Sequence, residues 1–448
     1  TYTSYTNGFF TQATERISEI SVTTNGSQTH RYLFGYVEGE NGRSMLETIT
    51  ESSENASGET VTLPDIRFTY TGADISLTHN AEVIFPEVTW TDASGLEYTT
   101  PFSLSDDYVR VMDVNGDGLK DIVKSYSIQV NGVDYPIFWV LVNTGHGWEV
   151  DASWTQPVYS YVNRDGSTVT NLFTFVGSEV VGDWNGDALD DLILFWAEDI
   201  GGGASQQQSV VLLNTGDGWE QDTAVTINVA TAEDGTELFV NSGADSSYMV
   251  DLNGDGLLDY LYATDTQTNG ISNPRFAVWY NQNGSLVWDD TVSVPWVEYE
   301  VSGSTESVPL SLTSSVRPLE VNVYGLVDFL YANDYQINGV DYPSFWVLLN
   351  NGHGWTQDMT IEHPTYEYTD TSGGAFTTYL NTSTSWSVMD VNGDYLSDWV
   401  YLSSTDVRGV VFNRTYVLVN TGQGWIQDDS LIDVGEYAYP DTNDTAQT

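Results

Sequence analysis

The sequence has no cysteine and very little positive charge. Its 448 residues include 12 Lys and Arg against 64 Asp and Glu, which gives a formal net charge of −52. Without cysteine the chain forms no disulfide, thiolate metal site or cysteine nucleophile. A chain this acidic is not expected to bind nucleic acid or to insert into an anionic membrane, because both partners require clustered Lys or Arg.

Long apolar runs are also missing. The best one, Phe138 to Val142, has the length of a strand and falls far short of the roughly 18 residues that span a bilayer. The chain begins Thr1-Tyr2-Thr3 with no basic or apolar leader, so we expect any signal peptide to be absent or already removed. Apolar residues make up 40% and aromatic residues 13%, which favours a folded protein over a disordered acidic tail.

What the sequence does contain is a repeat. A nine-residue acidic segment occurs five times, and the copies begin 68 to 70 residues apart, at Asp113, Asp183, Asp251, Glu320 and Asp390. A second marker follows each copy after about 30 residues and ends in a tryptophan, namely Trp148, Trp219, Trp288, Trp355 and Trp425. Five copies in constant phase indicate a repeat architecture.

Each repeat reads as four short strands. Around the first acidic segment, Tyr108–Met112 and Ile122–Tyr126 show strand patterns. Asn131-Gly132 is a two-residue hairpin signal, Phe138–Val142 reads as a buried strand, and Trp148 starts an outer strand. Four strands per ~70 residues, repeated around an axis, are typical of a β-propeller blade. We therefore predict an all-β protein with a five-repeat β-propeller over residues 83–448.

Residues 1–82 lack both markers but still look β-rich. Strand patterns occur at Ile17–Val22, Arg31–Tyr36 and Ile66–Tyr70. This region is predicted to form an extra blade or a separate small β domain. The C-terminal stretch 432–439 is a candidate to complete a blade with residues 83–112 and close the ring.

The acidic segments predict calcium sites. In the first copy, side-chain oxygens recur at relative positions 1, 3, 5 and 9, and the Leu119 carbonyl at position 7 can add a backbone oxygen. Hard oxygen ligands in this number suit Ca²⁺ better than Mg²⁺. An EF-hand is not indicated, because position 12 is Lys124 and the flanks are strands.

The alternative is an Asx-turn that caps strand ends without metal. Four copies in register favour the metal, since grouped carboxylates repel one another unless a cation neutralises them.

Four copies keep all the ligands. The expected metal-binding residues are Asp113, Asn115, Asp117, Leu119, Asp121, Asp183, Asn185, Asp187, Leu189, Asp191, Asp251, Asn253, Asp255, Leu257, Asp259, Asp390, Asn392, Asp394, Leu396 and Asp398. Ala188 and Tyr395 replace the glycine at position 6, so the backbone there is expected to be less relaxed. The copy at Glu320–Asp328 has Tyr324 at its centre and is the poorest candidate for a fifth site.

Weak sites of this kind point to an extracellular location. With a Kd near ~10⁻⁴ M and Ca²⁺ at ~10 mM, each site contributes about 2.7 kcal/mol to folding, and four contribute on the order of 10 kcal/mol. That total is comparable to the stability of a domain. Cytosolic Ca²⁺ is too low to fill such sites, so we expect a secreted, bacterial protein.

The DxNxDGLxD segments resemble the calcium loops of integrin alpha-subunit propellers and of bacterial FG-GAP/VCBS repeats, over roughly residues 83–440. Together with the following LVNTGxGW strand, they look like the propeller of bacterial toxin-complex B components and of Rhs- and SpvB-type secreted proteins. The resemblance implies a propeller that serves as a shell or docking platform, with Ca²⁺ bound by the loops that begin at Asp113, Asp183, Asp251 and Asp390. The chain lacks the YD-repeat array of Rhs proteins.

Three functions stay open at this stage. The first is a non-enzymatic, calcium-stabilised module for adhesion or for a fibre or surface assembly, with homo-oligomers formed through the N-terminal region. The second is a carbohydrate-binding propeller, and the third is a shell component of a toxin system. No HExxH, GxSxG or phosphate-binding glycine loop is present, so no enzyme activity is expected.

The aromatic residues and histidines divide by their place in the repeat. Tryptophans at a fixed repeat phase are predicted to pack between blades, and these are Trp139, Trp148, Trp219, Trp346, Trp355 and Trp425. Trp184, Trp196 and Trp399 fall outside that phase and are the better candidates for stacking on a sugar. His146 and His353 occupy equivalent turns and are expected to be exposed.

Overall fold

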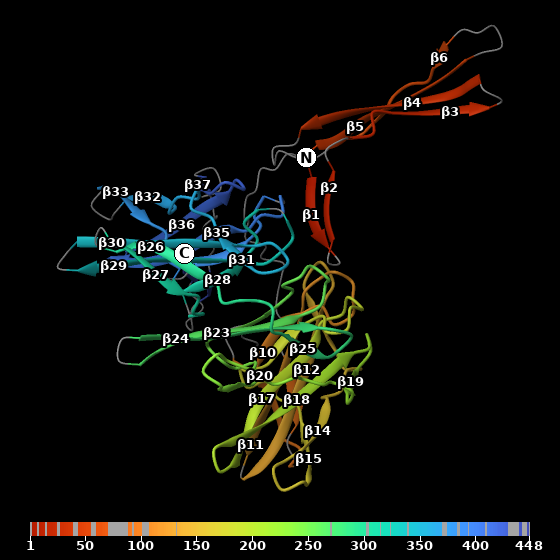
Figure 1. The fold of residues 1–448 in the computed structure, drawn as a ribbon. Coiled ribbons are helices and arrows are strands. Elements are labelled where there is room, and N and C mark those ends of the chain that lie inside the picture. The colour runs from red at the N-terminus through yellow and green to blue at the C-terminus, as the bar shows by residue number, and fades with distance from the viewer. Residues whose placement is uncertain are drawn as a thin grey trace.

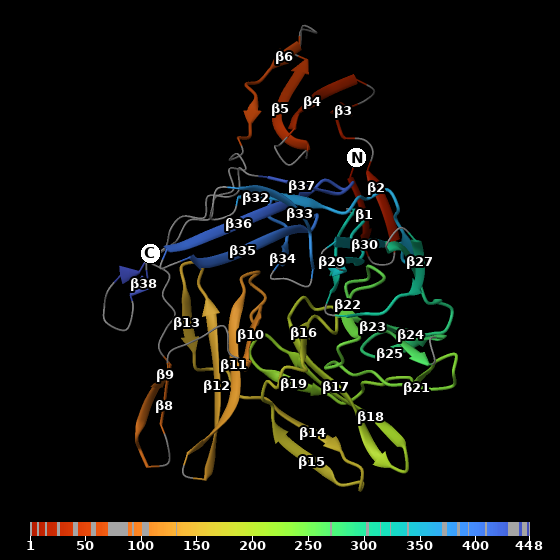
Figure 2. The ribbon, with the colours of Figure 1, turned by 90° about the vertical axis from the view of Figure 1, so that its left-hand side faces the viewer.

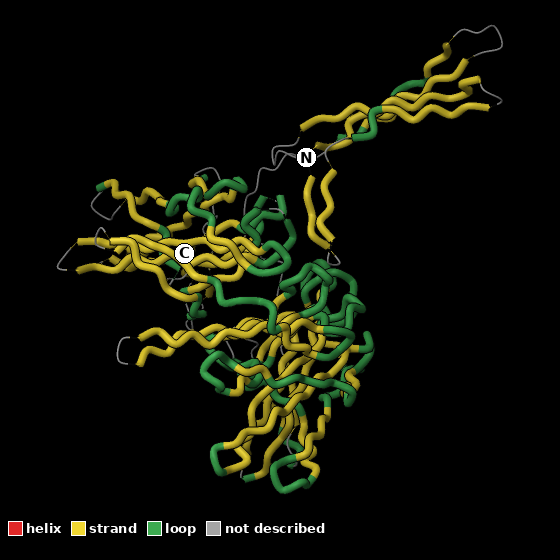
Figure 3. Tube along the Cα trace, viewed as in Figure 1, coloured by secondary structure: helices red, strands yellow, loops and turns green. Residues whose placement is uncertain are grey.

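The structure is a computed structural model that consists of strands and loops, with no helix among the residues that it describes (Figures 1 and 3). The described residues are 2–6, 9–13, 16–24, 27–38, 44–54, 60–69, 88–91, 94–100, 107–130, 132–268, 271–301, 304–313, 315–322, 324–337, 340–369, 374–382, 386–392, 394–407, 410–428, 439–440 and 446–447.

Five antiparallel sheets of four strands form the body of the molecule, one for each sequence repeat. We call them sheets 1 to 5. Sheet 1 contains β10 (Val109–Met112), β11 (Asp121–Val130), β12 (Val133–Asn143) and β13 (Trp148–Asp151). Sheet 2 contains β16 (Val180–Gly182), β17 (Asp191–Gly201), β18 (Ala204–Asn214) and β19 (Trp219–Asp222). Sheet 3 contains β22 (Ser247–Val250), β23 (Asp259–Thr268), β24 (Ile271–Asn281) and β25 (Leu286–Asp289).

Sheets 4 and 5 repeat this order. Sheet 4 contains β28 (Val316–Leu319), β29 (Asp328–Ile337), β30 (Val340–Asn350) and β31 (Trp355–Gln357). Sheet 5 contains β34 (Trp386–Met389), β35 (Asp398–Val407), β36 (Val410–Asn420) and β37 (Trp425–Gln427). Figure 2 shows the sheets following one another along the chain in a propeller-like arrangement.

Consecutive sheets pack face to face, because the central strands carry apolar residues on both faces. Each of the four largest apolar clusters joins a sheet to the next one. Between sheets 1 and 2, for example, Val123 and Val140 pack with Leu192 and Leu212, all at most 1% exposed. The all-β propeller-like fold predicted from the repeat is confirmed.

A two-stranded hairpin lies between successive sheets, which the sequence pattern did not predict. These hairpins are β14 (Val158–Val162) with β15 (Thr168–Leu172), β20 (Ala230–Thr231) with β21 (Glu237–Leu238), β26 (Trp296–Val301) with β27 (Ser304–Pro309), and β32 (Thr365–Thr369) with β33 (Ala375–Tyr379). A further hairpin, β8 (Val88–Thr91) with β9 (Glu97–Thr100), precedes sheet 1. Val88 of this hairpin packs on Ile122 and Leu141 of sheet 1.

A glutamine holds three of these hairpins to the outer strand of the next sheet. In sheet 2, the Gln221 amide accepts a hydrogen bond from Ser160 N and donates one to Ser160 O, both at 2.8 Å. Gln357 and Gln427 make the same pair of bonds to the backbones of Glu298 and Glu367. The hairpin is therefore a regular part of these repeats.

The N-terminal residues form a separate sheet that extends away from the five others (Figure 1). Its strands are β3 (Glu19–Thr24), β4 (Ser27–Glu38), β5 (Ser44–Glu54), β6 (Thr60–Thr62) and β7 (Ile66–Arg67). The hairpin of β1 (Tyr2–Thr6) and β2 (Phe9–Ala13) precedes it. Among the side chains that the structure describes between residues 16 and 69, no hydrophobic one is buried.

The short C-terminal strands β38 (Tyr439–Pro440) and β39 (Ala446–Gln447) pair with each other. The domain boundary expected at residues 82 and 83 lies outside the described residues, as does most of the stretch 432–439 that was expected to close the ring.

Candidate functional site

The acidic segments occupy the same place in every sheet, at the turn between its first and second strands. We call them loops 1 to 5, for residues 113–121, 183–191, 251–259, 320–328 and 390–398. Position 9 of each loop is the first residue of the long second strand. The spacing in the sequence predicted this placement correctly.

Loop 1 is wound by hydrogen bonds from its own backbone to its acidic side chains. Asp113 Oδ1 accepts from Gly116 N and Asp113 Oδ2 accepts from Gly118 N, both at 2.8 Å. Asp117 Oδ1 accepts from Leu119 N at 2.8 Å, and Asn115 Oδ1 accepts from Asp117 N at 3.0 Å. These are Asx-type turns. Each bonded carboxylate oxygen keeps a second acceptor site, so the turns orient oxygens without using up their capacity to bind a cation.

The same winding recurs in loops 2, 3 and 5. The position 1 aspartate accepts from the backbone N of position 6 at 2.8 Å in all three, where that residue is Ala188, Gly256 and Tyr395. Loop 4 keeps the hydrogen bond between positions 1 and 6 but not the carboxylate at position 5. Glu320 Oε1 accepts from Gly325 N at 3.0 Å, but Tyr324 supplies no carboxylate at the centre.

The aspartate at position 9 is fully buried in all five loops, and its exposed fraction is 0% at Asp121, Asp191, Asp259, Asp328 and Asp398. In loop 3, Asp259 Oδ2 accepts from Leu252 N at 2.9 Å and Oδ1 accepts from Asn281 N at 2.8 Å. Equivalent bonds occur in the other four loops. This carboxylate therefore joins the loop to the end of the third strand, whether or not metal binds.

Burial disfavours the charged form of these aspartates. It raises the pKa of Asp191 to about 7, that of Asp259 to about 8 and that of Asp398 to about 6, and the backbone hydrogen bonds oppose this shift. The neighbouring carboxylates at positions 1 and 5 raise these pKa values further. In loop 4, burial raises the pKa of Glu320 to about 7.

The backbone at position 6 is left-handed in loops 1, 2, 3 and 5. Gly118 and Gly256 have φ of 82° and 88°, and Ala188 and Tyr395 have φ of 69° and 65°. For a residue with a side chain, this conformation costs ~1–2 kcal/mol. The strain expected at Ala188 and Tyr395 is therefore present.

Neighbouring loops contact one another. Asp190 of loop 2 accepts hydrogen bonds from Asp113 N at 2.7 Å and from Lys120 Nζ at 2.8 Å. In loops 4 and 5, Ser397 Oγ accepts from Glu320 N at 2.9 Å. A change in the conformation of one loop therefore acts directly on the conformation of the loop bonded to it.

An asparagine at the end of the third strand also joins consecutive sheets. Its Nδ2 donates to the backbone oxygen at position 2 of the preceding loop, from Asn214 to Val114, Asn281 to Trp184, Asn350 to Leu252 and Asn420 to Val321, at 2.8–3.1 Å. In sheet 1, Asn143 Nδ2 donates to Lys120 O of its own sheet at 3.2 Å. We did not predict this link, although an asparagine recurs at this point of every second marker.

The residues of loops 1, 2, 3 and 5 fit a calcium ion in their chemistry. Each loop carries Asn and Asp side chains on a short turn, and a divalent cation would neutralise carboxylates that burial and mutual repulsion destabilise. The structure does not itself show a metal centre: the described residues include no cluster of three or more His, Cys, Asp or Glu side chains arranged to hold an ion. Calcium binding at these loops stays a prediction.

The other singled-out residues divide between surface and core. His146 and His353 are exposed, as expected. Trp346 and Trp425 are buried between sheets, and Trp219 and Trp355 pack against the clusters between sheets 1 and 2 and between sheets 3 and 4, as predicted. Trp139 and Trp148 pack instead on the cluster that sheet 1 forms with Val88 of hairpin β8–β9. Trp184 and Trp399 are wrong as sugar-stacking candidates, because both are 0% exposed and lie within the cores between sheets. Trp196 is partly exposed.

The part of the chain that the structure describes has no helix long and apolar enough to cross a membrane. No family model matches the sequence, and no curated protein matches it. Among solved structures, the chain is similar to a chain in the crystal structure of TcdB2-TccC3-Cdc42, with 12% identity and a TM-score of 0.26. The match covers 89% of this chain and 18% of that chain, so this chain spans less than a fifth of its length.

Proposed function

We propose that the protein is a secreted, calcium-stabilised β-propeller that acts as a structural or adhesive module and has no enzymatic activity. The observation that carries the proposal is the recurrence of loops 1, 2, 3 and 5 at the turn between the first and second strands of their sheets. Each of these loops has side chains with oxygen atoms at positions 1, 3, 5 and 9. Calcium supplies positive charge where the chain has very little of its own.

The residues of each loop have separate tasks in this proposal. The carboxylates at positions 1 and 5 and the amide oxygen at position 3 provide ligands that the Asx-type turns already orient. The buried aspartate at position 9 holds the loop to the third strand and adds a further oxygen. Because Asp190 and Lys120 connect loops 1 and 2, ordering one loop also orders its neighbour.

Assembly is proposed to occur between copies of this chain, through the N-terminal sheet. β3 lies at the edge of that sheet, and all six of its residues are exposed. Such an edge presents unpaired backbone groups that can pair with a strand of another copy. Residues 1–69 contain four Arg and nine Asp or Glu, so they hold a third of the chain's cations and repel another copy less than the rest of the chain does.

The test is a thermal melt in millimolar calcium and after chelation, run beside native mass spectrometry. We expect four bound ions per chain and a melting temperature that falls by well over ten degrees on chelation, because the sites together contribute on the order of 10 kcal/mol. An unchanged melting temperature, or a chain without bound ions, would refute the proposal.

Matched variants locate the ions. The pair Asp113→Ala and Asp117→Ala should reduce the count from four to three. The pair Glu320→Asp and Tyr324→Asp gives loop 4 the ligand pattern of the other loops and should raise the count to five. If neither pair changes the count, the ions are bound elsewhere.

A further inference from the structure

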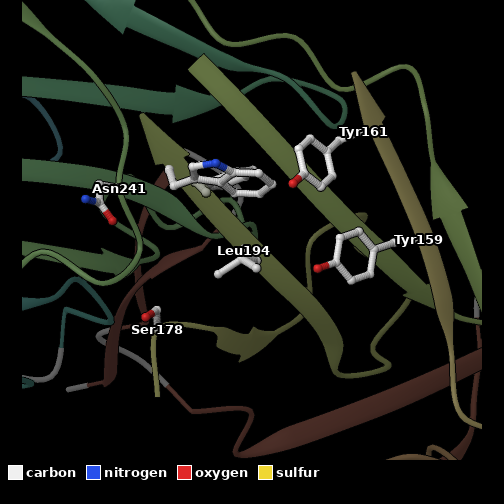
Figure 4. Close-up of a pocket in the computed structure, with 7 residues that line it drawn as sticks. Tyr159, Tyr161, Ser178, Leu194 and Asn241 are labelled. Carbon is white, nitrogen blue, oxygen red and sulfur yellow. The ribbon is translucent and has the colours of Figure 1, made fainter. Parts of the chain in front are cut away.

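A pocket of about 240 Å³ opens between hairpin β14–β15 and sheet 2. Its lining includes Tyr159 and Tyr161 of β14, Leu194 and Trp196 of β17, Ser178 and Asn241. Figure 4 shows the hydroxyls of Tyr159 and Tyr161 on the side of their rings that faces Leu194, with Ser178 and Asn241 across the same space. None of the residues that line the pocket belongs to an acidic loop.

A comparison within the molecule explains why this pocket is open. The position of Leu194, three residues after the buried aspartate, carries a tyrosine in the next three sheets: Tyr262, Tyr331 and Tyr401. Leucine at this position leaves room for a ring that sheets 3, 4 and 5 contain, whereas sheet 1 has Lys124 there.

The contrast is clearest with sheet 5, whose hairpin also carries two tyrosines. There Trp386, only 6% exposed, fills the space beneath Tyr366, with ring centroids 5.2 Å apart. Sheet 2 has Glu179 at the position of Trp386, and Glu179 forms an ion pair with Arg110. Sheet 2 thus lacks the counterparts of Tyr401 and Trp386, which are two of the side chains that fill this space in sheet 5.

The walls of the pocket combine aromatic faces with polar groups. The rings of Tyr161 and Trp196 meet edge to face with centroids 5.1 Å apart, and the ring of Tyr159 packs on Phe173. In the described part of the chain, no residue forms a hydrogen bond with the hydroxyl of Tyr159, Tyr161 or Ser178. Asn241 Oδ1 accepts from Gly243 N at 3.1 Å, and its Nδ2 donates to no residue in the described part of the chain.

We propose that this pocket binds one unit of a neutral carbohydrate. Sugar rings present apolar C–H faces to aromatic side chains and hydroxyls to hydrogen-bonding groups, and both kinds of partner line the pocket. The lining has no Lys or Arg, and the chain's charge of −52 repels anionic sugars and phosphates. The volume lies just below the range usual for drug-sized ligands, so it suits a single sugar unit or the end of a glycan chain. This inference gives a ligand class to the adhesive role proposed above.

The test measures binding of glucose, galactose, mannose and N-acetylglucosamine to the full chain in millimolar calcium, by saturation-transfer NMR and calorimetry. We expect at least one of them to bind with a Kd in the millimolar range. Tyr159→Phe and Tyr161→Phe should each weaken binding about fivefold to tenfold through the loss of one hydrogen bond. Trp196→Ala should weaken it at least as much.

The decisive variant is Leu194→Tyr, which places in sheet 2 the ring that sheets 3, 4 and 5 carry. It should abolish binding while the melting temperature is kept, whereas Phe376→Ala, an exposed aromatic residue of hairpin β32–β33, should leave binding unchanged. The proposal is overturned if none of the four sugars binds or if Leu194→Tyr binds as well as the original chain. Neither result would alter the calcium dependence of the melting temperature, so failure here is distinct from failure of the structural role.

Discussion

The buried aspartate at position 9 has a structural role that does not depend on a bound metal. It is present even in loop 4, where the ligands at positions 1 and 5 have changed. Its two oxygens bind backbone groups of the loop and of the third strand, and a substitution there would leave buried N–H groups without partners. The loop geometry therefore depends on this residue, whereas in the calcium-binding role proposed above the affinity is expected to depend on the acids at positions 1 and 5.

These buried acids predict how the metal-free protein responds to pH. Burial raises the pKa of Asp259 to about 8 and of Asp191 to about 7 above their ordinary values near 4, so the folded state holds protons that the unfolded state has lost. This stability is complete below about pH 4 and is lost as the pH rises through 7 to 8. After dialysis against chelator, the melting temperature should be lower at pH 8 than at pH 5.

Calcium and salt separate this effect from general charge repulsion. In millimolar calcium the melting temperature should change little between pH 5 and 8. Sodium chloride at about 0.5 M screens surface charges but not buried ones. The melting temperature of the metal-free protein should therefore still fall between pH 5 and pH 8 at this salt concentration. A melting temperature that stays flat or rises with pH in the metal-free protein would contradict the prediction.

The strained position 6 of the loops gives a second prediction at the same scale. Replacing Ala188 or Tyr395 by glycine should relieve the left-handed strain and raise the free energy of unfolding by up to ~1 kcal/mol, after the entropy of the added glycine is subtracted. Gly118→Ala is the reverse control. Its added methyl group meets no atom within 4 Å, so the expected loss of ~1 kcal/mol comes from the backbone alone. Denaturant melts compare the free energy of unfolding of the three variants with that of the original chain. Equal values would show that the left-handed backbone at position 6 carries no strain.

At the scale of elements, the asparagine after the third strand is the main polar link between sheets. Asn281→Ala removes the bond from Asn281 Nδ2 to Trp184 O, as well as the bond that Asn281 Oδ1 accepts from Gly284 N. Because the Trp184 carbonyl is buried, we expect a loss of about 1–3 kcal/mol in the free energy of unfolding, measured by denaturant melts.

Asn143→Ala is the matched control, since Asn143 caps its own turn in the same way but donates to Lys120 of its own sheet. It should cost less than Asn281→Ala, and the difference measures the link between sheets. If both variants lose the same stability, the link contributes nothing beyond the local turn.

The elements that the sequence predicted are those with a strong local signal. The alternating and apolar runs around each acidic segment placed the four strands of every sheet, and the constant spacing placed the loops. The hairpins between sheets were missed, although Tyr159 and Tyr161 alternate ahead of the Asp165-Gly166 turn. The link from Asn281 was missed because its acceptor lies 97 residues away, a distance that local patterns do not cover.

At the scale of the whole molecule, no hydrophobic side chain that the structure describes in the N-terminal sheet is buried. Deleting residues 1–25 should therefore leave the melting temperature of the body nearly unchanged while it abolishes assembly, measured by analytical ultracentrifugation. Ile20→Lys with Val22→Lys should have the same effect without a deletion, because charges on an edge strand oppose pairing. Assembly that survives both changes would place the contact between copies elsewhere.

The link between sheets has a consequence for how such a gene can change in length. From sheet 2 onward, each unit carries a donor for the unit before it, and sheets 1 to 4 each carry the acceptor for the unit after them, so a gain or loss of one complete unit by recombination leaves every interior donor matched. A change of half a unit would separate an asparagine from the backbone carbonyl to which it donates. Copy number can therefore vary in whole steps of about 70 codons, and only the terminal units need a sequence of their own.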